Sequence, residues 1–125
     1  FIANAIIDQH FSQRQRLSRL LSALAQRPDL LGVGIDEDTA LVIERGQSIE
    51  VVGRGAVTLV DPRKMQSNFD LISSEEKLEM LGLQLHLLPA GHRYVVPSTL
   101  KNNKKQPTAL WEALYLLAQT GPMRD

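Results

Sequence analysis

FIANAIIDQHFSQRQR, residues 1–16, places an apolar run directly before a dense group of polar side chains. The run over residues 1–7 has the length and composition of a buried strand. Asp8, Gln9 and His10 follow at the carboxyl end of that strand, the edge where open α/β sheets hold their ligands. The stretch therefore predicts an α/β fold with a site at the end of its first strand.

A helix is expected after this strand. Ser12 is a suitable N-cap and Pro28 ends the pattern, with leucines at helical spacing between them. These leucines are Leu17, Leu20, Leu21 and Leu24. Arg16 and Arg19 lie about 60° apart on the helical wheel, away from the leucine stripe, so they can point at one anion.

The central part of the chain predicts short strands. Apolar or β-rich runs cover residues 30–35, 39–44, 48–52 and 56–61, and glycine-containing turns separate the last three, as in a β meander. A helix beginning near residues 73–77 and a strand over 83–88 are expected next. Residues 97–107 are polar and basic, and 108–119 predict a helix that docks after this linker.

Composition limits the classes of function. The 125 residues are 43% hydrophobic and 22% charged, which fits one globular domain or part of a larger one. Lys plus Arg and Asp plus Glu both number 14, so no net field recruits nucleic acid or an anionic membrane. The absence of cysteine excludes disulfides, thiolate nucleophiles and Cys-based zinc sites. No apolar run reaches the roughly 18 residues of a membrane-spanning helix.

His10 is the candidate for acid–base chemistry. It can act as a general base if a carboxylate holds its second ring nitrogen, and Glu37 or Asp36 could provide that carboxylate. Asp8 and His10 are two residues apart, so both would face one side of an extended strand. Metal binding by a set drawn from these residues and Asp38 is an alternative, although no recognised ligand spacing supports it. In a structural alternative, Asp36 and Asp38 only end a strand and cap the turn.

Arg14, Arg16 and Arg19 stand close together at the start of the expected helix. The helix dipole favours negative charge at this end, so three positive side chains need another reason. Recognition of a substrate carboxylate by guanidinium groups is one interpretation, and a solvated helix face is the other.

Three blocks of the sequence resemble one family. Residues 8–16 (DQHFSQRQR), 32–40 (GVGIDEDTA) and 52–57 (VGRGAV), in this order, are similar to the C-terminal half of the cyanophycinases, which are serine peptidases of the peptidase E clan. The resemblance implies a class I glutamine amidotransferase-like sandwich, an α/β fold with a largely parallel sheet flanked by helices. Residues 1–95 would contribute its C-terminal strands and the β meander, and residues 96–125 a linker and a docking helix.

The resemblance also implies a reaction and its residues. Cyanophycinases hydrolyse cyanophycin, a poly-aspartate with arginine on each side chain, to β-Asp-Arg dipeptides. His10 would be the general base and Glu37 the acid that orients it. The residues matching the family's substrate cleft are Asp8, Gln9, Arg14, Arg16 and Arg19. The acidic groups would bind the substrate guanidinium, and the arginines would bind the substrate carboxylates. No cofactor or metal is implied, and the complete enzyme is expected to be a cytoplasmic homodimer.

The sequence departs from the family pattern at two points. Gln15 stands where the HF-x-x-R-G-R pattern has glycine. No serine of the chain stands in a Gly-x-Ser-Ala-Gly nucleophile elbow, so we expect this chain alone to be inactive. The nucleophile would then come from a missing N-terminal part or a companion chain. An aspartyl dipeptidase of the same clan and a non-catalytic module that binds an Asp- or Arg-rich ligand are the alternatives.

Overall fold

A computed structural model describes residues 4–11, 16–73, 75–96 and 108–120. The described elements are helices α1 (Arg16–Gln26) and α2 (Thr108–Thr120) and strands β1 (Ala5–Gln9), β2 (Leu31–Ile35), β3 (Thr39–Glu44), β4 (Ser48–Gly53), β5 (Ala56–Asp61), β6 (Gln66–Ser67), β7 (Met80–Leu81), β8 (Gln84–Pro89) and β9 (Arg93–Val95). Neither helix is long and apolar enough to cross a membrane.

The main sheet confirms the α/β class, but β1 (Ala5–Gln9) ends later than expected and includes Asp8 and Gln9. Its strand order is β1-β2-β5-β8. β1 runs parallel to β2, with Gln9 opposite Ile35 at their carboxyl ends. β5 and β8 continue the sheet in antiparallel pairings. Within the described residues, parallel pairing is therefore limited to the two strands whose ends carry the candidate site.

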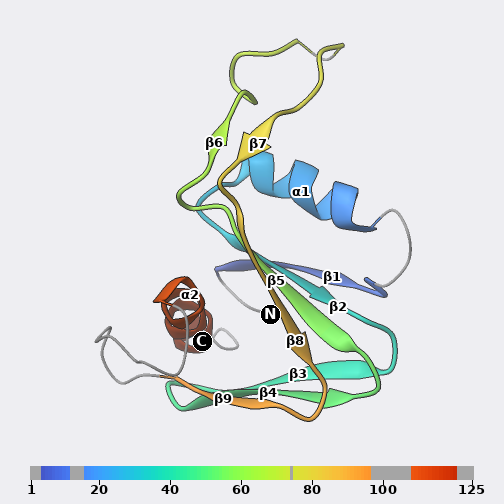
Figure 1. Ribbon diagram of the computed structural model, residues 1–125, viewed down its shortest axis with the longest axis vertical. Coiled ribbons are helices and arrows are strands. Elements are labelled where there is room, and N and C mark those ends of the chain that lie inside the picture. The colour runs from blue at the N-terminus through green and yellow to red at the C-terminus, as the bar shows by residue number, and fades with distance from the viewer. Residues whose placement is uncertain (1–3, 12–15, 74, 97–107, 121–125) are drawn as a thin grey trace, which may run out of the picture.

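The four strands predicted between residues 30 and 61 all form, but they do not make one meander. β3 and β4 pair as a hairpin, and β9 joins them in a second sheet of order β3-β4-β9. β5 returns instead to pair with β2. The burial of β3 alternates residue by residue, as expected for a strand with one face in the core. The hairpin thus folds away from the main sheet and lies beneath it (Figure 1).

The two faces of the main sheet are covered by different elements. α1 packs on one face, where Leu20 and Leu24 join Val60 in a core cluster. Gly32 lies under this helix, and a Cβ there would stand only 2.7 Å from Leu24 Cδ1. On the other face Leu31, Val33 and neighbouring side chains form the larger core cluster with the second sheet and α2. The molecule therefore has a helix, a sheet, and a mixed layer of sheet and helix (Figure 1).

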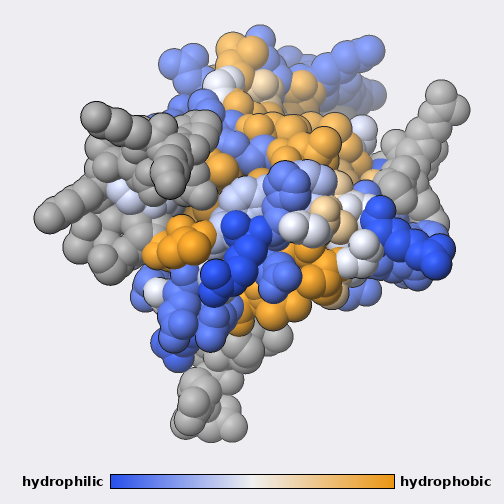
Figure 2. All heavy atoms as spheres, turned by 60° about the horizontal axis from the view of Figure 1, so that its bottom comes forward, coloured by the Kyte–Doolittle hydropathy of each residue, from blue (hydrophilic) through white to orange (hydrophobic). Residues whose placement is uncertain are grey.

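The outer face of the second sheet is mixed in character. Val42, Val52 and Val95 are exposed apolar residues of its three strands. Figure 2 turns the bottom of Figure 1 toward the viewer and shows apolar patches interrupted by hydrophilic side chains.

The helix expected near residues 73–81 does not form in the described residues. Ser73 N–H does donate to Glu76 Oε1 over 3.1 Å, as in a capping box, but no helical turn continues from it. Met80 pairs instead with Ser67 in the short β6–β7 ladder. A helix stopped at Gly82 would hold only about two turns, and such short helices are marginal without tertiary packing.

The helix expected over 108–119 is present as α2. Leu110, Leu114 and Leu117 are buried and belong to the larger core cluster. The expected linker over 97–107 lies outside the described residues. The division of the chain at residue 95 stays a prediction.

His86 on β8 should make folding stability depend on pH. Its Nε2 is buried and has no hydrogen-bond partner among the described residues. Burial lowers the pKa of His86, and the nearby negative charge of Asp61 only partly opposes this. The unfolded chain, with a His pKa of about 6.5, therefore binds the proton more readily than the folded chain. Stability should fall as the pH drops below about 6.5.

The measurement is the midpoint of urea denaturation between about pH 7.5 and 5.5. His86→Gln should flatten the dependence seen in the unmodified protein, and His92→Gln, at an exposed position, is the comparison variant. Equal slopes for all three proteins would contradict the assignment to His86.

Candidate active site

The candidate site begins where β1 and β2 end side by side. His10 follows directly after β1, and Asp36 directly after β2. The backbone of His10 is left-handed, with a φ of 57°, and the next residue, Phe11, donates its N–H to Ile35 O over 3.0 Å. The chain thus turns sharply at His10, and the next residue is hydrogen-bonded to the end of β2. Sparsely populated backbone conformations of this kind cluster at functional sites.

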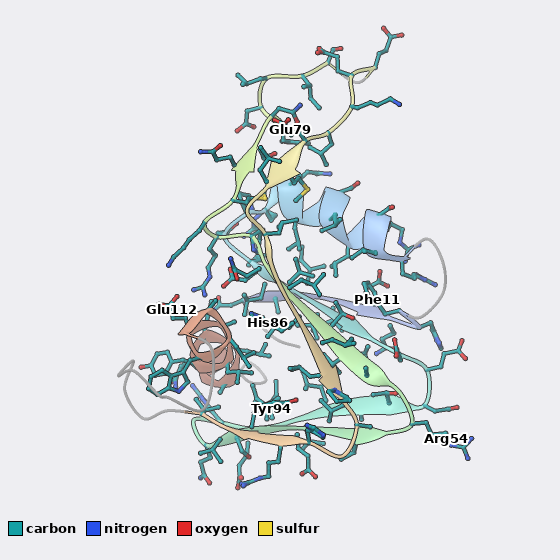
Figure 3. All side chains as sticks on the ribbon, viewed as in Figure 1. Phe11, Arg54, Glu79, His86, Tyr94 and Glu112 are labelled. Atoms are coloured by element: carbon teal, nitrogen blue, oxygen red, sulfur yellow. The ribbon has the colours of Figure 1, made fainter. Side chains whose placement is uncertain are left out.

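Phe11 anchors this turn. Its ring is buried in the cluster beneath α1, and Figure 3 labels it near the end of β1. A Cβ at Gly34 would overlap the Phe11 ring, so glycine is required on β2 for the ring to lie there. The packing of Phe11 fixes the position of the residue before it, His10.

His10 and Glu37 face each other across the two strand ends. His10 Nδ1 lies 3.4 Å from Glu37 Oε1. Both side chains are about half exposed, at 57% and 52%. They line one pocket of about 330 Å³, together with Gln9, Asp38 and neighbouring residues of β3. Glu37 therefore lies on the Nδ1 side of the imidazole, at the edge of this pocket.

Asp8 lies in a separate charged group with two arginines of α1. Its Oδ1 is 3.3 Å from Arg16 Nη1 and 3.5 Å from Arg19 Nη2. The carboxylate is only 12% exposed, whereas the Arg19 side chain is 66% exposed. Arg16 and Arg19 therefore share a carboxylate of the chain itself, a partner that neither interpretation of the sequence named, and their role in substrate binding stays a prediction.

The expectation that Asp8 and His10 face one side of a strand is wrong. Strand alternation ends at Gln9, because His10 already has left-handed backbone. Ile6 packs on the α1 face, and Asp8, two residues later, meets the arginines of α1. Gln9 lines the pocket with His10. The site therefore has two parts: a His10–Glu37 pocket and an Asp8–arginine cluster.

The three acidic residues that follow β2, at positions 36–38, make different contacts. Asp36 Oδ2 accepts a hydrogen bond from Ala56 N–H over 2.9 Å, so the structural interpretation of Asp36 is confirmed. Of the two carboxylates considered for His10, it is Glu37 that faces the imidazole. Asp38 has left-handed backbone, with a φ of 53°. Among the described residues, no group of three or more His, Cys, Asp or Glu is arranged to hold a metal ion.

Several residues fall outside the predictions or outside the described part. Arg14, Gln15 and the expected cap Ser12 are not among the described residues. Thr39 and Gly55, which contact the loop that carries Glu37, had no role in the sequence analysis. The glycine pair of the 52–57 block was the available signal, because two glycines flanking one residue between strands mark a close backbone approach.

No protein-family model matches the chain. Curated relatives do match it over 94 residues, 74% of the chain. The chain is 47% identical to the cyanophycinase of Geminocystis herdmanii, 46% to that of a Nostoc species and 45% to that of Synechococcus elongatus. The match covers 35%, 32% and 29% of these proteins, so the chain spans about a third of the length of the curated relatives. The resemblance to cyanophycinases is confirmed.

Proposed function

We propose that this chain is the histidine-bearing, C-terminal part of a cyanophycinase, a serine exopeptidase that hydrolyses cyanophycin to β-Asp-Arg dipeptides. The observation that carries the proposal is the His10–Glu37 pair in its pocket, within a chain 45–47% identical to relatives named cyanophycinase. Residues 1–95 would complete the peptidase domain from its C-terminal side, and residues 96–125 would be a linker and docking helix.

In the proposed reaction His10 is the general base and then the general acid. Nε2 takes the proton from a serine hydroxyl as its oxygen attacks the scissile carbonyl, and returns that proton to the leaving amine. Glu37, on the Nδ1 side, holds the ring in the required orientation and stabilises the imidazolium that forms. The serine and its oxyanion donors would come from the part of the enzyme beyond this chain, so the chain alone would be inactive.

The charged cluster suits the carboxylates of such a substrate. Arg16 and Arg19 together carry one positive charge more than Asp8 neutralises, and Arg19 is largely open to solvent. We assign Arg16, Arg19 and Arg14 to the aspartyl carboxylates of the polymer. Gln9, which lines the histidine pocket, would contribute an amide to substrate binding. Asp8, which the resemblance assigned to the substrate guanidinium, is paired with Arg16 and Arg19 instead and would take part in binding through them.

The free side of β1 is where the rest of the enzyme would join. In the described sheet β1 is an edge strand, and Ile7 is exposed on it. Strands in parallel pairings are normally buried on both faces and flanked on both sides. A strand from the N-terminal part, or from a companion chain, would pair with β1 and bring the serine toward His10. The complete enzyme is proposed to be a cytoplasmic homodimer.

The test is hydrolysis by the complete protein of cyanophycin and of small α-aspartyl dipeptides. Release of β-Asp-Arg from cyanophycin alone supports the proposal, whereas cleavage of the dipeptides alone identifies an aspartyl dipeptidase. Binding of cyanophycin without hydrolysis would identify a non-catalytic module. The intact mass of the natural protein gives an independent readout, because the proposal requires a polypeptide carrying the serine.

Arg16→Ala should weaken substrate binding more than it slows the chemical step. Loss of a charge-assisted hydrogen bond costs about 1.5–3 kcal/mol, which corresponds to a KM raised roughly 10- to 100-fold. Steady-state kinetics on cyanophycin measure this effect. The matched control is Arg27→Ala at the far end of α1, where the guanidinium pairs with Asp29. A fall in kcat with unchanged KM would contradict the binding role.

A further inference from the structure

The loop that carries Glu37 is held by a second loop. Residues 36–38 join β2 to β3, and residues 54–55 join β4 to β5. Backbone bonds link this region, from Asp36 N–H to Ala56 O at the start of β5 over 3.2 Å and from Arg54 N–H to Asp38 O over 3.0 Å. The Asp36 carboxylate adds a third link by accepting the N–H of Ala56. The position of Glu37 is therefore set by β4 and β5 as well as by β2.

Thr39 joins Glu37 to this second loop through one hydroxyl. Thr39 Oγ1 donates to the carbonyl oxygen of Glu37 over 2.9 Å. The same oxygen accepts the N–H of Gly55, also over 2.9 Å. The hydroxyl thus bridges the backbone of the residue that faces His10 and the backbone of the neighbouring loop. Serine is the other residue whose hydroxyl could make both bonds from this position, whereas valine keeps the shape and makes neither.

Two glycines make this close contact possible. Gly53 has a backbone φ of +117°, and a Cβ at this position would overlap Asp38 O. A Cβ at Gly55 would stand 2.6 Å from Asp36 Cβ and 2.8 Å from Thr39 Oγ1. Neither separation is reached in ordinary packing, so a side chain at either position would push the two loops apart. The fold therefore brings the loops together at the point where Thr39 forms its bridge.

We propose that Thr39 is a positioning residue: its hydroxyl fixes Glu37 so that the carboxylate holds His10 in the tautomer with the proton on Nδ1. That tautomer leaves the Nε2 lone pair free to accept a proton. The inference rests on the proposed roles of His10 and Glu37. It assigns to Thr39 no contact with substrate, and it predicts that the hydroxyl acts on His10 only through Glu37.

The experiment measures the His10 tautomer by ¹⁵N NMR of histidine-labelled complete protein at about pH 9, where imidazoles are neutral. Thr39→Val should lower the ratio of the Nδ1–H to the Nε2–H tautomer roughly two- to tenfold, the effect of losing a hydrogen bond of ordinary strength. Thr39→Ser should restore the ratio. Gly55→Ala, which crowds the same hydroxyl, should lower it as Thr39→Val does. Thr58→Val on β5 is the matched control, and the signals of His86 and His92 serve as internal references.

A cycle with Glu37→Gln separates positioning from general destabilisation. In the Glu37→Gln background, Thr39→Val should have no further effect on the His10 ratio. An unchanged ratio in Thr39→Val, an equal fall in both backgrounds, or failure of serine to rescue would each overturn the inference. If the unmodified protein does not hydrolyse cyanophycin while the cycle behaves as stated, the proposed substrate is wrong and the positioning role stands.

Discussion

Replacement of His10 by alanine is expected to lower turnover of cyanophycin by about three orders of magnitude or more, with little change in KM. The expected loss follows from the proposed role of the ring, whose Nδ1 faces Glu37. In that mechanism the ring accepts the serine proton and donates it to the leaving amine, so the variant would lack both functions. Binding is assigned to other groups, the arginines of α1 among them, so KM should be nearly conserved.

His92→Ala is the control for this measurement. His92 is exposed and lies near Tyr94 of the second sheet, outside the residues that line the His10 pocket. Its replacement should leave both kinetic constants unchanged. Turnover of His10→Ala within a factor of about ten of the unmodified enzyme would exclude a general base at this position.

Leu114→Ala is expected to destabilise the protein by about 2–5 kcal/mol, the range for removing a buried leucine side chain. Leu114 is fully buried on the inner face of α2 and packs in the larger core cluster. The cavity would lie in the core cluster that also holds side chains of the main sheet, so the loss should reach the whole fold. Urea denaturation of the complete protein, with mutant and unmodified midpoints compared, measures the effect.

Leu71→Ala provides the matched control, since Leu71 is 85% exposed in the segment between β6 and β7. That change should cost less than about 0.5 kcal/mol. A similarly small effect of Leu114→Ala would show that α2 is an appendage to the domain. The same comparison tests the division of the chain at residue 95, because a large effect makes α2 a part of the core.

Local pattern predicted most strands of this fold but not their partners. The runs around β2, β3, β4 and β5 are each bounded by turn residues, which is a local signal. Their distribution between two sheets depends on packing: the hairpin of β3 and β4 buries Ile49 and Val51 against the underside of the main sheet. β9 was missed because its three residues follow a glycine turn and carry too short a pattern.

The helix expected near residue 76 does not form in the part of the chain that the structure describes, although its capping residues are present, because later residues pair with β6. Ser73 and Glu76 do interact, yet Met80 and Leu81 pair with β6 and form no helix. A capping interaction favours a helix by about 1 kcal/mol, which a ladder and a nearby glycine can outweigh.

The sequence predicted at which edge of the sheet the site lies, but not which side chains of the site pair with each other. Two polar segments after apolar runs indicated that His10 and the 36–38 segment would meet, and the parallel pairing of β1 and β2 brings them together. The choice of Glu37 over Asp36 came from the resemblance, since the two residues are adjacent and chemically alike. The partners of Asp8 depended on where β1 ends, and the precise end of a strand is among the least predictable features of a sequence.

The left-handed backbone at His10 limits how this position can change over time. Few residues other than glycine adopt that conformation readily, and asparagine, aspartate and histidine are the ones enriched in it. β-branched replacements would strain the turn that Phe11 anchors. Asn, Asp or Gly at position 10 would therefore keep this turn, and with it the buried ring of Phe11, more readily than other replacements.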